Sequence, residues 1–106
     1  MDDLLDGAEL CVTASLSGGT LRVNVVGDVD LASAPRLKAM LDLSQLGGVY
    51  RLELDLSGVT FFSCAGIDAV QGARRDGVNL LLVAAAPPVT RMLALLPMSD
   101  RRLQAV

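Results

Sequence analysis

The segment L-D-L-S-G-V-T-F-F-S-C-A-G-I-D, residues 54–68, constrains the fold of this chain more than any other. Apolar and charged residues alternate from Arg51 to Leu56, which is the period of a half-buried strand. Ser57-Gly58 then interrupts the alternation and predicts a turn. The segment therefore predicts a strand over Arg51–Leu56, a connection that returns to the core, and then a helix.

Small residues open this predicted helix. Ser63 suits the N-cap position, and Cys64, Ala65 and Gly66 follow it. A helix start carries unpaired N–H groups and the positive end of the helix dipole, so it favours an anion or a hydrogen-bonding partner. Because no large side chain stands here, another protein can approach the backbone closely. We therefore expect a contact surface at this helix start.

Strands and helices alternate along the rest of the chain. A β-hairpin is predicted from Glu9–Leu16 and Leu21–Val25, joined by Ser17-Gly18-Gly19-Thr20. Helices are predicted over Ala32–Leu43, over Cys64–Arg75, closed by Asp76-Gly77, and over Val89–Leu96, stopped by Pro97. A strand is predicted over Leu80–Val83, and an edge strand or frayed tail over Arg101–Val106. The continuous apolar run Leu80–Val83 predicts an interior strand. The hairpin has one polar face, so we expect helices on the opposite face only. The predicted fold is α/β (α+β-like), with a single sheet of four or five mixed strands.

Two motifs resemble the STAS domain family, which includes anti-sigma factor antagonists and the cytoplasmic tails of sulfate transporters. The family pattern D-L-S-x-V-x-F-x-D-S-S-G is matched at Asp55, Leu56, Ser57, Val59, Phe61 and Gly66. Upstream, G-D-V-D-L-A-S-A-P at residues 27–35 is similar to the family's G-x-x-D-x-x-x-A-P entry into its first helix. The resemblance covers most of the chain and implies a STAS-like fold, in agreement with the elements above.

The chain departs from the family at the phosphorylation position. In phosphorylated antagonists, a partner kinase modifies the serine that directly precedes the glycine of the family pattern. In this chain that glycine is Gly66, and Ala65 occupies the serine position. Ser63 falls where the family often has aspartate, and Cys64 falls on the first serine. The resemblance therefore implies a docking surface without the usual switch. Ser63 is interpreted as an N-cap, with a substitute phosphorylation site as the alternative.

The resemblance also implies which residues touch a partner. These are Asp28, Asp30, Ser63, Cys64, Ala65, Gly66 and Asp68. From the residues alone, Asp28 and Asp30 are interpreted as turn and helix-capping carboxylates. The implied partner is an anti-sigma factor of the histidine-kinase-like ATPase type. Alternatively, the chain is a small STAS subunit of a membrane lipid-transport complex, bound to its ABC-type ATPase. A small-ligand sensor or vestigial enzyme is a third hypothesis.

Composition argues against an enzyme and against nucleic acid as a ligand. The chain has 106 residues, a formal net charge of −3 and no histidine, so the usual general base near neutral pH is missing. No phosphate loop or cluster of metal ligands is present, and we expect no cofactor. The longest apolar run, Leu80–Val89, is too short to span a bilayer. We expect one cytoplasmic domain over residues 1–106, with residues 1–8 flexible.

The two cysteines show no metal-ligand or redox spacing. We therefore expect Cys11 and Cys64 to be free thiols, as is usual in a reducing cytoplasm. A cysteine among small residues is usually buried, and this is the interpretation of Cys64. A reactive thiol at the helix start, where the dipole lowers the thiol pKa, is the alternative.

Overall fold

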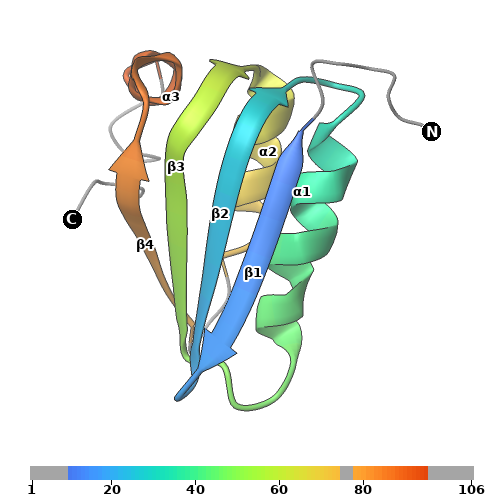
Figure 1. Cartoon of the computed structure of the whole chain (residues 1–106), viewed down its shortest axis with the longest axis vertical. Helices are drawn as coiled ribbons and strands as arrows, with labels where there is room; N and C mark the ends of the chain where they lie inside the picture. Colours follow the sequence, from blue (N-terminus) through green and yellow to red (C-terminus); the bar gives the residue numbers. More distant parts are fainter. Residues whose placement is uncertain (1–9, 75–77, 96–106) are drawn as a thin grey trace.

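In a computed structural model, which describes residues 10–74 and 78–95, one mixed sheet carries helices on one face (Figure 1). The elements are β1 (Cys11–Ser17), β2 (Thr20–Val29), α1 (Ala34–Leu41), a short 3-10 helix η1 (Asp42–Gln45), β3 (Arg51–Phe62), α2 (Cys64–Gln71), β4 (Asn79–Ala85) and α3 (Pro87–Leu93). The four strands lie in the order β1-β2-β3-β4. The predicted fold class is confirmed.

The N-terminal hairpin forms as predicted. β1 and β2 pair antiparallel in an unbroken register from Cys11↔Val26 to Ser17↔Thr20. The turn between them is Gly18-Gly19, whose φ angles are 56° and 81°. A two-residue hairpin turn of type I′ has positive φ at both central positions, and glycine adopts such angles without strain.

The remaining strands are parallel. β2 pairs parallel with β3, and β3 pairs parallel with β4. The connection from β2 to β3 contains α1, and the connection from β3 to β4 contains α2, because parallel neighbours need a crossover. The carboxyl ends of β2 and β3 therefore lie together at one end of the sheet, with the amino-terminal ends of α1 and α2 beside them (Figure 1).

The core lies between the sheet and its helices. Alternate strand residues and the apolar stripes of the helices fill it; its largest fully buried side chains are Leu10, Val23, Val25, Val29, Leu37, Leu41, Leu52, Leu54, Leu56 and Val89. Nearly all of this core is aliphatic, as the low aromatic content of 3% requires.

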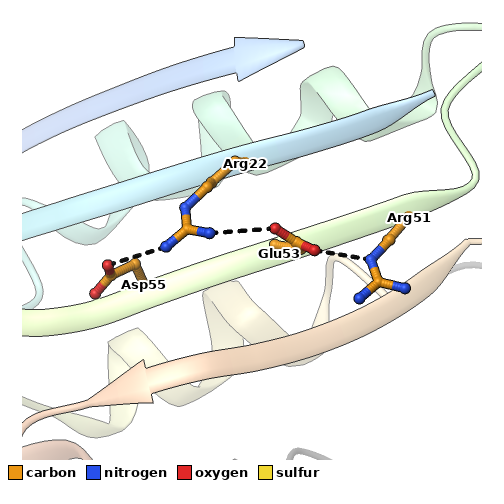
Figure 2. A network of polar contacts seen from close by, with 4 residues as sticks. All are labelled: Arg22, Arg51, Glu53 and Asp55. Atoms are coloured by element: carbon orange, nitrogen blue, oxygen red, sulfur yellow. Dashed lines mark hydrogen bonds and ion pairs between the residues drawn. The ribbon is translucent and has the colours of Figure 1, made fainter. Parts of the chain in front are cut away.

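The opposite face of the sheet is polar. Arg22 on β2 bridges Glu53 and Asp55 on β3, each at 3.4 Å, and Arg51 contacts Glu53 at 2.8 Å (Figure 2). The arginine side chains are about half exposed, so each pair contributes little to stability. The network does confirm that this face meets water.

The predicted turn at Ser57-Gly58 is wrong. β3 continues through these residues to Phe62, and its pairing with β2 absorbs them through register shifts. Gly58 lies so close to β2 that a Cβ atom there would be 2.8 Å from Cγ2 of Val26 and 3.2 Å from the carbonyl oxygen of Val25. The glycine marks a close approach of two backbones inside the sheet, not the end of a strand.

The bounds of one helix and one strand differ from the predictions. The helix predicted to reach Arg75 ends at Gln71, with Gly72 as its C-cap. The strand predicted over Leu80–Val83 is present and longer, as β4 (Asn79–Ala85), and among the described residues it pairs with β3; its predicted interior position involves Arg101–Val106, which lie outside the described residues. Of its residues only Leu82 is fully buried, and it lines a small void together with Ile67 and Val70 of α2 and Val89 of α3.

The other helices differ slightly from their predicted bounds. α1 begins at Ala34 and passes into η1 at Asp42. α3 begins at Pro87, because proline is well tolerated in a first helical turn. The predictions for residues 1–8, for Asp76-Gly77 and for Arg101–Val106 lie outside the described residues.

Candidate functional site

The candidate site is built where β2 and β3 end. Val29 and Phe62 are register partners at the last position of each strand, and the N–H of Ser63 donates to the carbonyl of Val29 at 2.9 Å. This pairing brings the two sequence motifs, far apart in the chain, to one end of the sheet. The segments that start α1 and α2 are therefore neighbours, as the prediction of one contact surface requires.

Asp30 shapes the turn before α1. The N–H of Ser33 donates to Oδ1 of Asp30 at 2.9 Å, and the N–H of Asp30 donates to Oγ of Ser33 at 3.0 Å. The Ser33 hydroxyl donates onward to the carbonyl of Asp28 at 2.8 Å. Hydrogen bonding of Ser33 to the Asp30 carboxylate, first from its backbone N–H and then from its side chain, lowers the pKa of Asp30. The carboxylate has the local turn role that its residue type suggests.

Asp28 has a different partner. Its carboxylate accepts a hydrogen bond from the hydroxyl of Thr60 on β3. Asp28 is half-buried and pairs in register with Phe61, which is 51% exposed. Asp28 thus lies beside Thr60 and Phe61 at the end of β2, whereas Asp30 lies in the turn before α1, and each is held by its own neighbour.

Ser63 caps α2. Its Oγ accepts from the N–H of Ala65 at 3.2 Å, and its carbonyl accepts from the N–H of Gly66 at 2.9 Å. The residue has extended backbone, as an N-cap requires. The N-cap interpretation is confirmed, and the hydroxyl is held against the helix backbone.

The small residues after Ser63 divide between surface and core. Cys64 and Asp68 are exposed, Ala65 is half-buried, and Gly66 is buried. The interpretation of Cys64 as a buried thiol is wrong, because the first turn of α2 directs its side chain away from the sheet. Cys11 is exposed as well, and both cysteines are free thiols. Gly66 faces the core, so we do not carry it into the contact surface proposed below.

A groove runs between α1 and α2 at this end of the molecule. It has a volume of about 280 Å³ and is lined by Leu31, Ala34, Pro35, Lys38, Ala65, Asp68 and Ala69. Alanines from both helices form its floor, and Lys38 and Asp68 place opposite charges on its two sides. Leu31 at the rim is 82% exposed, the most exposed of the large apolar residues that the structure describes.

Five groove residues were not among the predicted site residues: Leu31, Ala34, Pro35, Lys38 and Ala69. Leu31 carried a signal in the sequence. It lies in a turn segment, directly after Asp30 and before Ser33, where no periodic pattern assigns it to a core. An apolar residue without a predicted core position is a candidate for an interface.

The described residues hold no group of ligands that suits a metal ion. Among the helices of the same part of the chain, none is both long enough and apolar enough to cross a membrane.

Comparison with protein families gives one match. The model described as "Mlab, STAS domain" matches residues 12–104. None of the curated proteins compared with this chain matches it.

Solved structures share the fold. An anti-sigma factor antagonist from Mycobacterium paratuberculosis is 22% identical, with a TM-score of 0.74 over 83% of this chain and 78% of that one. The antagonist SpoIIAA in its unphosphorylated form is 15% identical, with a TM-score of 0.65 over 82% of this chain and 84% of that one. The Bacillus cell fate determinant SpoIIAA in its phosphorylated form is 13% identical, with a TM-score of 0.69 over 91% of both chains. At these identities, the likeness shows the fold.

Proposed function

This chain belongs to the STAS domain family, and we propose that it is a cytoplasmic protein-binding module of the anti-sigma factor antagonist type. It docks on an anti-sigma factor of the histidine-kinase-like ATPase type and thereby releases a sigma factor. The observation that carries this proposal is the position of Ala65. It stands where phosphorylated relatives have a serine, and it lies at the surface, on the floor of the groove between α1 and α2.

The proposed contact surface extends along this groove. Ser63, Cys64, Ala65 and Asp68 form one side, and Leu31 stands at the rim of the other. Asp28 and Asp30, at the end of β2 and in the turn before α1, complete the proposed surface, although neither lines the groove. An exposed leucine next to a groove with an apolar floor is suited to bury apolar area against a partner, and such anchors contribute most of the binding energy of many interfaces.

The methyl group of Ala65 makes the module permanently competent. A phosphate at this position would bring negative charge and bulk into a close contact, and alanine has no hydroxyl to accept one. The Oγ of Ser63 caps α2 by accepting from the N–H of Ala65, and we assign it this structural role. Control of this module then rests on its amount or on a different site, and not on phosphorylation at position 65.

The first experiment measures binding to the cognate anti-sigma ATPase by calorimetry. We expect the wild-type chain to bind and Leu31→Ala to weaken binding about tenfold or more, because truncating a buried anchor costs over 1 kcal/mol. Leu46→Ala is the matched control, since Leu46 is 57% exposed and follows η1, beyond the other end of α1. Failure of the wild type to bind any such ATPase refutes the proposed function. Equal losses in both variants refute the role of Leu31.

The second experiment tests the missing switch. After incubation with ATP and the cognate kinase, we expect the intact mass of the wild-type chain to stay unchanged, and Ala65→Ser to gain one phosphate. Ala65 is half-buried at the surface, so serine fits there without repacking the core. A phosphate on the wild-type chain at Ser63 contradicts the prediction and places the switch at the N-cap.

The description of the matching family model favours a second candidate. It names Mlab, and a chain without the phosphorylatable serine also fits a structural role as the small STAS subunit of a lipid-transport complex. A pull-down from native extract separates the two. Recovery of a soluble kinase-like ATPase supports the first function, and recovery of an ABC-type ATPase supports the second.

A further inference from the structure

The strand β1 forms an edge of the sheet (Figure 1). Among the described residues it pairs with β2 alone, so one side of its backbone has no strand partner. Unpaired N–H and C=O groups along an edge are a template for another strand. Natural proteins usually protect such edges with charges, proline or bulges.

None of these protections is present in β1. Its sequence, C-V-T-A-S-L-S, contains no charged residue and no proline. Its register with β2 shows no shift over all seven positions, so no bulge twists the edge away. The apolar side of the strand is also incompletely covered, because Val12 and Ala14 are half-buried and Leu16 is 57% exposed.

The hairpin fixes which backbone groups point outward. In a two-residue hairpin, the pair next to the turn, Ser17 and Thr20, exchanges both hydrogen bonds, and bonded and non-bonded pairs then alternate. The N–H and C=O groups of Thr13 and Ser15 are therefore directed at β2. Those of Val12, Ala14 and Leu16 are directed at the open edge.

We propose that two copies of this chain dimerise by antiparallel pairing of their β1 strands about Ala14, which joins two sheets into one. In this register, Ala14 faces Ala14 of the second copy and Val12 faces Leu16. These are the residues whose backbone groups point outward, so each opposed pair exchanges two hydrogen bonds. The exposed Leu16 gains an apolar neighbour, and Thr13 meets Ser15 on the polar face. The strand is complementary to itself in hydrogen bonding, polarity and charge, as a two-fold interface requires.

The edge at β4 does not offer the same pairing. β4 carries a register shift opposite Leu54 and Asp55, which interrupts its ladder. Dimerisation through β1 does not use the groove between α1 and α2. The inference therefore does not depend on the partner proposed above.

Two measurements on the full chain test this inference. Sedimentation should show twice the mass of the chain as the concentration rises from micromolar to millimolar. Over the same range, amide hydrogen exchange should slow about tenfold or more at Val12, Ala14 and Leu16, and should change little at Thr13 and Ser15, which bond to β2 in either state. A monomer at every concentration overturns the proposal, and so does a dimer without this alternating protection.

A matched pair of variants tests the register. Thr13→Glu/Ser15→Glu places like charges opposite one another across the dimer, and Thr13→Lys/Ser15→Glu places opposite charges there. Both positions are exposed, and in both variants the glutamate at position 15 lies opposite Arg22 within its own chain. We expect the dimer dissociation constant of the first to exceed that of the second by about tenfold, since each opposed pair contributes some tenths of a kcal/mol. Equal constants overturn the pairing about Ala14.

Discussion

Gly66 shows how strictly one position can be constrained. A Cβ atom added there would lie 2.7 Å from Cε1 of Phe62 and 2.9 Å from Cγ1 of Val29, both of which are core residues. The glycine that matches the family pattern thus allows the first turn of α2 to pack directly on the ends of β2 and β3. Packing in the core therefore explains why glycine occupies this position, and no contact with a partner is needed to explain it.

Substitution of this glycine should destabilise the protein. In Gly66→Ala, the gain in helix propensity is about 1 kcal/mol, and overpacking against two buried side chains costs about 1–3 kcal/mol. We therefore expect a lower free energy of unfolding in urea. Gly72→Ala is the control, because Gly72 has a helical φ of −66° and is exposed, so alanine should raise stability by about 0.4–1 kcal/mol. A gain in both variants contradicts the packing argument.

At the scale of the element, β3 shows how a strand continues through an irregularity in its pairing. Asp55 lies near the middle of the strand and accepts hydrogen bonds from the hydroxyl of Ser57 at 2.6 Å and from its N–H at 3.0 Å. The carboxylate therefore stabilises the backbone just where β3 shifts register with its neighbours. The D-L-S motif is a device for continuing a strand through an irregularity.

This arrangement predicts a pH dependence. The hydrogen bonds from Ser57, with the Arg22 guanidinium, lower the pKa of Asp55 below its ordinary value of 3.8. A carboxyl whose pKa is lowered by folding stabilises the protein above its unfolded pKa, and this contribution is lost as the pH falls through the folded value. Asp55→Asn keeps an acceptor oxygen but does not titrate. We expect its free energy of unfolding to fall less steeply than that of the wild type between about pH 4 and pH 2.

The control for this measurement is Asp68→Asn. Asp68 is exposed on α2, away from Ser57 and Arg22 of the sheet. Its substitution should leave the acid slope close to that of the wild type. If Asp55→Asn and Asp68→Asn give the same slope, the Ser57 hydrogen bonds do not couple folding to pH.

At the scale of the whole molecule, stability rests on one aliphatic layer between the sheet and its helices. Leu54 is fully buried at its centre, and with Leu56, Ile67, Val70 and other residues from β3, β4, α2 and α3 it encloses a void of only about 10 Å³. Such tight packing makes the layer sensitive to any loss of volume. A chain of this size has little stability in reserve.

Truncation at the centre should therefore be severe. We expect Leu54→Ala to cost about 2–5 kcal/mol of unfolding free energy, through lost burial and the cavity left behind. Leu31→Ala deletes the same atoms at a position that is 82% exposed, and should change stability by less than about 0.5 kcal/mol. Thermal and urea unfolding of both variants check the contrast. Comparable losses would mean that Leu31 packs against the core.

The sequence by itself determined which side of each strand faces the core, where the hairpin turns and where α2 begins. These features depend on neighbours along the chain: the alternation at Arg51–Leu56, the glycines at Gly18-Gly19 and the cap at Ser63. The family resemblance added the expected fold class and a candidate surface.

Only the tertiary structure decided the rest. It showed that β3 runs through Ser57-Gly58, that among the described strands β4 pairs with β3 alone, that Cys64 is exposed, and that Leu31 borders a groove between α1 and α2. Each of these depends on which segments pair or pack across the fold. A local pattern shows that a residue prefers a buried or an extended state, but its actual neighbours are set by contacts between residues far apart in the chain.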